Sequence, residues 1–165
     1  MEKFQLAQQK AKKNLQVADH MLTVTYPMVK DPKLLASVME NLFLSLTNAM
    51  ASLLYLDRMY KRVPPFQDTF ESKFMVFRDK CARRYNIQKE YLDFILEVKN
   101  LVLEHKKSPV EFSRKDKFVI CSDNYSIKAI SVEKMKSYVA KAKMFVHQIN
   151  ILVEENDELF GRRGI

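Results

Sequence analysis

Histidines and cysteines are the residues most able to bind metals or act in catalysis, and this chain has few of them. The residue three positions before each histidine is apolar; the pairs are Val17 and His20, Val102 and His105, and Met144 and His147. The Glu-x-x-His pairs of a di-iron carboxylate bundle are therefore missing. Cys81 and Cys121 form no Cys-x-x-Cys motif. We expect no metal site, no cofactor and no disulfide framework, and a reducing, cytoplasmic setting.

Cys81 has two interpretations. Three cations lie around it in the segment Lys80–Tyr85, and neighbouring cations lower the pKa of a thiol and make it reactive. Its spacing from Phe74 and Phe77 instead places it on the apolar face of a helix. We favour an inert core cysteine.

His105 is the histidine with the most informative neighbours. It ends the segment Lys99-Asn-Leu-Val-Leu-Glu-His105 near the end of a predicted helix. This segment resembles the Arg-(polar)-x-x-x-x-His signature of HEPN-type helical bundles. The segment Glu40–Tyr55 also resembles the core helix of that superfamily, and the resemblance covers about residues 5–106.

The HEPN resemblance implies a role for each member of the pair. Active members of the superfamily cleave RNA, so Lys99 would hold a phosphate and His105 would transfer a proton. Lys99 stands where the family pattern has arginine, and a lysine lacks the bidentate guanidinium fork. The resemblance therefore predicts a bundle with weak or no catalysis. The alternative interpretation is that His105 is a solvated residue at the C-terminal dipole of its helix.

Positive charge is concentrated in two segments of the chain. The formal charge is +8, from 28 Lys+Arg and 20 Asp+Glu. Residues 58–89 contain nine cations and three acids, and residues 106–143 contain ten cations and four acids, so each segment carries +6. A large basic surface suits binding to RNA or another polyanion. The alternative is that these charges only face solvent and bind no ligand.

The second basic segment interleaves cations with aromatic rings in a predicted β-hairpin. Lys117–Ser122 and Tyr125–Ile130 are β-prone runs joined at Asp123-Asn124. Cations and rings together suit phosphate contacts and base stacking. The candidate nucleic-acid contacts are Arg114, Lys115, Lys117 and Lys128. A second basic face is expected on the last predicted helix, at about 132–159, from Lys134, Lys136, Lys141 and Lys143.

Glycine is nearly absent, which excludes several chemistries. The two glycines are Gly161 and Gly164. Walker phosphate loops, dinucleotide fingerprints and nucleophile elbows all require glycine within the fold, so they are excluded. The scarcity of glycine also argues against a sheet-rich fold, whose tight turns need it.

Apolar periodicity, prolines and N-caps predict the elements that position these residues. We expect an all-α fold, an antiparallel up-and-down bundle of about five helices with one small β-hairpin insertion at about 112–130, forming a single domain over 1–165. The predicted helices cover about 2–26, 32–60, 69–84, 88–106 and 132–159, with Pro27 ending the first, Asp68-x-x-Glu71 opening the third and Asn86 and Ser131 capping the last two. The uncharged stretch Asn41–Leu56 is too short for a membrane span and predicts a buried central helix.

A row of small polar residues follows the second predicted helix at steps of four, three and four; its members are Asn41, Ser45, Asn48 and Ser52. We favour helix packing over a ligand groove for this row.

Three functions remain open on these observations. The first is a HEPN-like bundle that binds RNA or another polyanion through the basic hairpin and helix-five face, without robust catalysis. The second is a homodimeric interaction or scaffold module, with the alanines of helix one allowing close approach. The third is a metal-independent ribonuclease that uses Lys99 and His105.

Overall fold

The computed structural model describes the backbone of residues 1–107, 110–114, 117–121 and 127–163, and the side chains of 1–106, 119–120 and 129–161. Within these residues five helices pack together, as predicted. Two of the five helices, the first and the third, are each made of several elements joined through a π-helical turn. The elements are α1 (Lys3–His20), η1 (Met21–Thr25) and α2 (Tyr26–Val29); α3 (Lys33–Met59); α4 (Phe70–Val76), η2 (Phe77–Cys81) and α5 (Ala82–Arg84); α6 (Lys89–Lys107); and α7 (Val132–Arg163).

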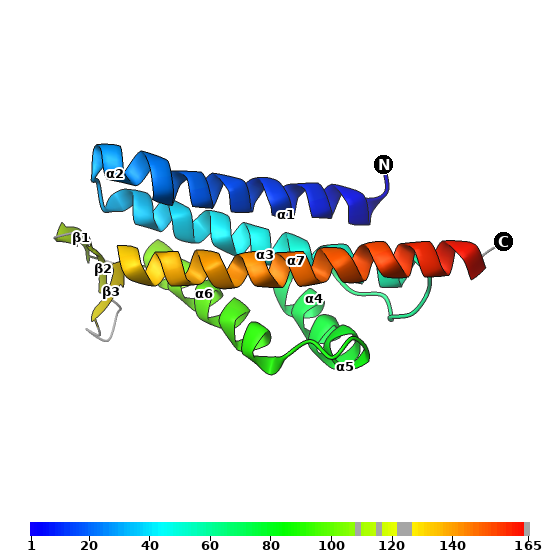
Figure 1. The fold of residues 1–165 in the computed structure, drawn as a ribbon. Coiled ribbons are helices and arrows are strands. Elements are labelled where there is room, and N and C mark those ends of the chain that lie inside the picture. Colours follow the sequence, from blue (N-terminus) through cyan, green and yellow to red (C-terminus); the bar gives the residue numbers. More distant parts are fainter. Residues whose placement is uncertain (108–109, 115–116, 122–126, 164–165) are drawn as a thin grey trace.

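α3 is the central helix of the bundle. It contacts α1, α4, α6 and α7, and Leu46 at its middle has no exposed surface. α1 runs antiparallel to α3, whereas α7 runs in the same direction as α3, because the shorter α4–α5 and α6 segments return the chain to the other end (Figure 1). α3 is also long and apolar enough to cross a membrane by length and composition alone, a test that a core helix passes as well, and 56% of its apolar window is buried.

Two helix boundaries differ from those expected. Pro27 does not end the first helix, which continues through the π-helical turn η1 until Lys30 adopts a left-handed φ of 55°. The irregular hydrogen bonding of a π-helical turn accommodates the proline that follows it. The third helix is capped by Thr69, which accepts a bond from the Ser72 N–H over 3.2 Å, because Asp68 pairs instead with Lys73 at 2.5 Å.

Two other predicted caps have different outcomes. Asn86, expected to begin the fourth helix, has a left-handed φ of 54° and follows the end of α5, a role that asparagine fills at helix C-termini. Ser131 caps the fifth helix as predicted, since its hydroxyl accepts a bond from the Lys134 N–H over 3.1 Å.

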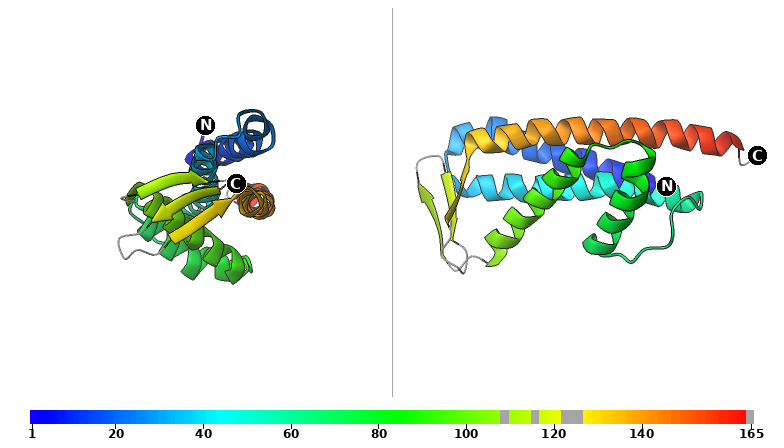
Figure 2. Two further views of the ribbon diagram at one scale, coloured as in Figure 1. Left: turned by 90° about the vertical axis from the view of Figure 1, so that its left-hand side faces the viewer. Right: turned by 90° about the horizontal axis from the view of Figure 1, so that it is seen from below.

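A small antiparallel sheet closes one end of the bundle. The predicted hairpin is present as β2 (Lys117–Cys121) paired with β3 (Ile127–Ser131), while its expected turn at Asp123-Asn124 lies outside the described residues. A third strand, β1 (Val110–Arg114), pairs with β2. Its alternating apolar residues, Val110 and Phe112, were the available signal for it. Figure 2 shows the sheet across the ends of the helices, and Ile120 and Ile130 are buried.

The small polar row of α3 serves helix packing at Ser45, whereas Asn48 lines a surface hollow of about 200 Å³. The side chains of this row donate to backbone oxygens, and Ser45 and Ser52 are fully buried. The Ser45 hydroxyl donates to the Ala11 carbonyl of α1 over 2.7 Å. Ala11 and Ala18 are themselves fully buried within this chain, so the small residues of α1 allow close approach to α3 and cannot face a second subunit.

Candidate functional site

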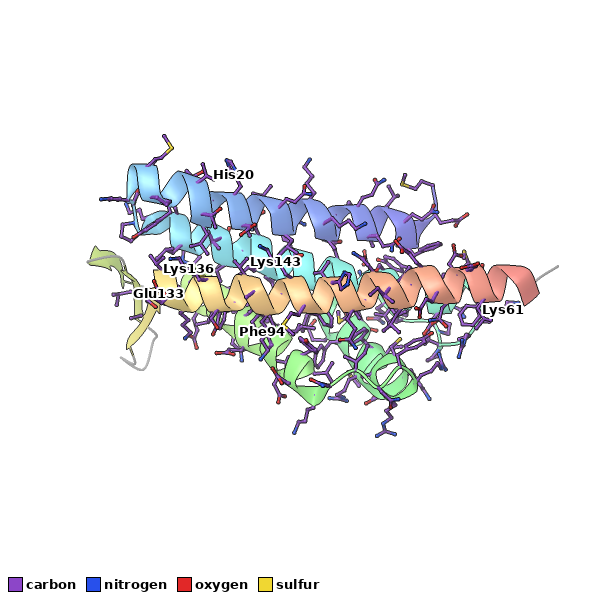
Figure 3. The ribbon with its side chains drawn as sticks, in the orientation of Figure 1. His20, Lys61, Phe94, Glu133, Lys136 and Lys143 are labelled. Carbon is purple, nitrogen blue, oxygen red and sulfur yellow. The ribbon has the colours of Figure 1, made fainter. Side chains whose placement is uncertain are left out.

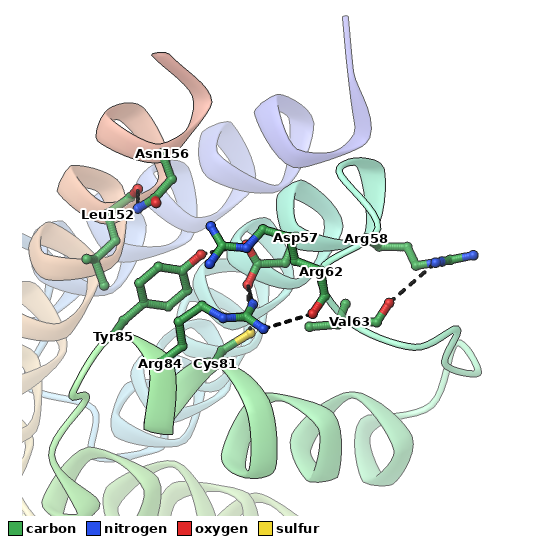
Figure 4. Close-up of polar contacts among 9 residues, drawn as sticks. All are labelled: Asp57, Arg58, Arg62, Val63, Cys81, Arg84, Tyr85, Leu152 and Asn156. Carbon is green, nitrogen blue, oxygen red and sulfur yellow. Dashed lines mark hydrogen bonds and ion pairs between the residues drawn. The ribbon is translucent and has the colours of Figure 1, made fainter. Parts of the chain in front are cut away.

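A buried carboxylate lies near the C-terminal end of α3. Asp57 has no exposed surface, which is unusual for an aspartate unless its oxygens are paired. Its Oδ1 accepts a 2.6 Å hydrogen bond from the Tyr85 hydroxyl, and its Oδ2 accepts bonds from Arg84 Nη1 at 3.2 Å and Cys81 Sγ at 3.4 Å (Figure 4). These contacts tie α3 to the end of the third helix.

The same group fixes the chain that follows α3. The Arg62 N–H donates to the Asp57 carbonyl over 2.7 Å, and Arg84 Nη2 donates to the Arg62 carbonyl over 2.9 Å. The Arg84 guanidinium therefore bridges a buried carboxylate and a backbone oxygen of the loop. Its donors are fixed in position by two partners, so Asp57 acts as a positioning residue for Arg84 and Tyr85.

Burial holds Cys81 and Tyr85 in their neutral forms. Desolvation, followed by the negative charge of Asp57 and a hydrogen bond to it, raises the pKa of the Cys81 thiol. Desolvation also raises the pKa of the Tyr85 hydroxyl, and the hydrogen bond to Asp57 adds to that rise. Cys81 is a core cysteine, as expected, and a buried neutral thiol is a poor nucleophile.

A hollow of about 610 Å³ opens beside this network. The Arg62 guanidinium lies 4.3 Å from the centre of the Phe160 ring, and the Tyr60 ring meets Phe160 edge-on at 5.0 Å. The Tyr60 hydroxyl donates to Asp157 over 3.3 Å. We call this hollow the arginine pocket; its described lining is Tyr60, Arg62, Arg84, Tyr85, Asn156, Leu159 and Phe160.

The lining of the arginine pocket contains two arginines. Within its described lining are two guanidiniums, two phenols and one amide, and no carboxylate. Two carboxylates border this lining, because Asp57 accepts from the pocket residues Arg84 and Tyr85, and Asp157 accepts from Tyr60. The charge of Arg84 is therefore balanced within the chain, whereas the Arg62 guanidinium lies over the Phe160 ring. Guanidiniums bind phosphate bidentately, and the volume is in the range of small-ligand sites. The pocket thus presents the Arg62 guanidinium beside an aromatic ring.

The predicted pair Lys99 and His105 lies on α6, and the two side chains have different partners. Lys99 Nζ pairs with Glu71 at 3.2 Å and lies 4.5 Å from the Phe70 ring centre. His105 Nε2 lies 3.5 Å from Glu40 of α3. Six residues on a helix correspond to a rise of about 9 Å and a rotation of about 120°. The two groups therefore do not meet in one pocket in this structure.

The predicted hairpin cations are placed only through their backbone. Arg114 and Lys117 are partners in the β1–β2 register, and Lys128 is the partner of Ile120 in β3. Lys115 lies outside the described residues, as do the side chains of the other three.

The predicted basic face of α7 is largely neutralised within the chain. Lys136 pairs with Glu133 at 3.6 Å, Lys141 with Glu90 at 3.0 Å, and Lys143 with Asp19 at 3.0 Å. Figure 3 shows Lys136 and Lys143 along the first half of α7, and Lys61 beside its C-terminal end. Lys134 lies 5.6 Å from the Tyr138 ring centre. These lysines are therefore poorer phosphate contacts than their number suggests.

The sequence contained two features that could have indicated the arginine pocket, but the basic hairpin was the stronger candidate. Asp57 is the first charge after the uncharged stretch Asn41–Leu56 of α3, and the first basic segment, residues 58–89, supplies both pocket arginines. No group of metal-binding side chains occurs within the part of the chain that the structure describes. Comparison with protein-family models and with curated proteins finds no match to this chain.

Proposed function

We propose that this protein binds RNA or another polyanion without catalysing its cleavage, and that the arginine pocket is the principal contact. One observation carries the proposal. Two arginines face a pocket of about 610 Å³ whose described lining contains no carboxylate, and a fully buried aspartate holds one of them in place. The ion pair between Asp57 and Arg84 alone would not require a second arginine, Arg62, beside the Phe160 ring.

The position of the pocket adds support. Arg58 and Lys61, both exposed, belong to the same end of α3 as Arg62. A polyanion that binds at this end of α3 would have these cations available, and its affinity depends mainly on how many phosphates are neutralised. The HEPN-like resemblance is part of this proposal, since that superfamily acts on RNA. The proposal includes the basic hairpin as a second region that contacts the polyanion. It also includes a cytoplasmic location and no role at a membrane.

A ribonuclease that uses Lys99 and His105 is a weaker candidate. General acid–base catalysis needs the two groups within reach of one phosphodiester, and here they contact Glu71 and Glu40 on different helices. We expect no RNA cleavage by the wild-type chain. A product ladder that disappears in His105→Ala would reverse this assignment.

A homodimeric scaffold is the second candidate, and one observation favours it. The outer face of the first helix exposes apolar side chains of unusual size; they are Leu6, Val17, Val24 and Met28, with Met28 81% exposed. Leu6 and Val17 share one face of α1 at helical spacing, and Val24 and Met28 continue the exposed stripe in and beyond the π-helical turn η1. A dimer would use this stripe and leave the arginine pocket open.

The binding proposal is tested with one substitution and a matched control. Arg62→Gln removes a pocket cation but keeps the backbone carbonyl that Arg84 uses. Fluorescence anisotropy with a labelled single-stranded RNA should show weaker binding, by several-fold at low salt, because one charge-assisted contact is lost. Lys13→Gln, an exposed lysine of α1, makes the same charge change away from the pocket and should bind like wild type. Equal affinities for all three proteins would contradict the proposal.

A further inference from the structure

A second hollow surface runs along α3 from its middle to its C-terminal end. Two hollows, of about 290 Å³ and 200 Å³, meet at the Tyr55 side chain, which lines both. The first also borders the N-terminus of α1 and the loop after α3, and the second borders the start of α4. We call this surface the Tyr55 groove; the rings and cations that matter below are Phe43, Tyr55, Phe66, Phe70, Lys3 and Arg58.

Half-buried aromatic rings line the groove. The Tyr55 and Phe66 rings are stacked at 6.0 Å with an angle of 24° between their planes. Phe43 and Phe70 follow at a centroid distance of 5.7 Å. All four are partly exposed, unlike the fully buried rings of Phe77 and Phe145. Part of each ring therefore remains accessible to a ligand.

The charge around these rings is positive. Lys3 Nζ and Lys73 Nζ lie 5.8 Å and 5.3 Å from the centre of the Tyr55 ring. Lys73 is neutralised by Asp68, at 2.5 Å. The other acid of the lining, Glu2, accepts from a backbone N–H in the first turn of α1 and keeps its negative charge, so three cations face two acids and the lining carries +1. Lys3 and Arg58 remain as the cations at the rim.

The groove and the arginine pocket lie on different sides of the C-terminal end of α3. Tyr55 lines the groove and Tyr60 lines the pocket, and five residues of helix correspond to a rise of about 7.5 Å and a rotation of about 140°. Arg58 lies between these two residues in the sequence and lines the groove. A chain with alternating phosphates and flat bases matches this sequence of cations and rings, because bases stack on aromatic side chains while phosphates contact the basic rim.

We propose that the Tyr55 groove receives the bases of a single-stranded RNA whose adjoining phosphates contact Arg58 and Lys3. This inference rests on the proposed function and narrows it from polyanions in general to a single strand with accessible bases. A duplex keeps its bases stacked and would use only the cations. A polyphosphate chain has no bases and would likewise use only the cations.

The experiment compares two ligands and two substitutions. Tyr55→Leu keeps apolar volume but removes the flat ring, and Phe66→Leu does the same in a loop, where the fold depends less on it. Loss of one stacked base corresponds to roughly 5- to 150-fold weaker binding. We expect a loss in this range for single-stranded RNA in each variant, an unchanged slope of log K against log salt, and unchanged affinity for polyphosphate. Tyr55→Phe keeps the ring and should bind RNA like wild type.

Each outcome decides between the two proposals. If both leucine variants melt like wild type and bind RNA equally well, the groove does not receive bases, although the pocket proposal stands. If wild type binds polyphosphate and duplex RNA as tightly as single-stranded RNA, the groove inference fails and the pocket proposal stands. If wild type binds none of them, both proposals fail. A photocrosslink from 4-thiouridine RNA to the wild-type chain needs no variant; it should map to the groove, and a map confined to other surfaces would overturn the inference.

Discussion

The Tyr85 hydroxyl donates a 2.6 Å hydrogen bond to Oδ1 of Asp57, a carboxylate with no surface exposed to solvent. The bond joins the central helix α3 to the residue directly after α5. Because the same carboxylate also holds Arg84, the fold at this end of the bundle and the shape of the arginine pocket depend on one side chain. Stability and binding should therefore be coupled at Asp57.

Asp57→Ala should lower the free energy of unfolding by about 2–4 kcal/mol, because it leaves Arg84 and the Tyr85 hydroxyl without their partner. Urea denaturation followed by circular dichroism measures this. Asp93→Ala removes an exposed carboxylate of α6 and should stay within about 0.5 kcal/mol of wild type. Similar losses in both variants would show that the Asp57 contacts do not hold the fold.

The protein should lose stability as the pH rises above about 9. The ordinary pKa values are 9.0 for Cys81 and 10.0 for Tyr85, and burial raises both in the folded chain. The unfolded chain then releases these protons at a lower pH than the folded chain, so the stabilisation is complete below the ordinary pKa values and is lost as the pH rises through the folded ones. Tyr138, whose pKa is raised by burial and by its bond to Glu97, contributes in the same direction.

Thermal melts across this alkaline range test the effect. Cys81→Ala and Tyr85→Phe each remove one titrating group, so the melting temperature of each variant should fall less steeply with pH than that of wild type. Both variants start from a lower melting temperature at neutral pH, because a buried contact to Asp57 is lost. Identical slopes in wild type and variants would rule out these two groups as the cause.

Leu46→Asp should abolish the cooperative melt, because an unpaired charge would enter the centre of α3, where Leu46 has no exposed surface. Leu44→Asp is the matched control on the same helix. Leu44 is 47% exposed, so its variant should melt close to wild type. A normal melt of Leu46→Asp would disprove the central position of α3.

The exposed stripe of the first helix predicts how a dimer would form. Val17→Glu with Val24→Glu should convert a dimer to a 19.5 kDa monomer in sedimentation equilibrium, because each protomer would place charges in an apolar interface. Arg62→Gln should leave the association unchanged. A wild-type chain that sediments as a monomer at every concentration would remove the scaffold candidate.

The sequence predicted the helices well because each has a long apolar period and a recognisable end. α3 and α7 follow their patterns almost without exception, and Ser131 caps α7 as its position indicates. The errors occur at helix ends. Asp68 pairs with Lys73, so Thr69 caps the third helix instead. The π-helical turn η1 lets the first helix continue past Pro27. Such choices depend on neighbours that a single sequence does not place.

The candidate site was harder to predict than the fold. Asp57 looked like one charge at the end of an apolar stretch, and its partners Cys81, Arg84 and Tyr85 come from a different helix. Pairing across 24 to 28 residues has no periodicity to reveal it. The basic count of α7 was also misleading, because Lys141 and Lys143 are paired with carboxylates of other helices.

The central claim, that polyanions bind at the C-terminal end of α3, is tested most directly by the salt dependence of RNA affinity in three variants. The first replaces Arg58, Lys61 and Arg62 with Gln; the second replaces Lys10, Lys12 and Lys13 of α1, which are exposed and make the same charge change; the third replaces Arg114, Lys115 and Lys117 of the hairpin. Each single-strand phosphate contact contributes about 0.7 to the slope of log K against log salt, so three lost contacts change it by about 2. We predict a change of this size for the α3 variant and the wild-type slope for the α1 variant. A wild-type slope in the α3 variant, with the change appearing in the hairpin variant instead, would contradict the account.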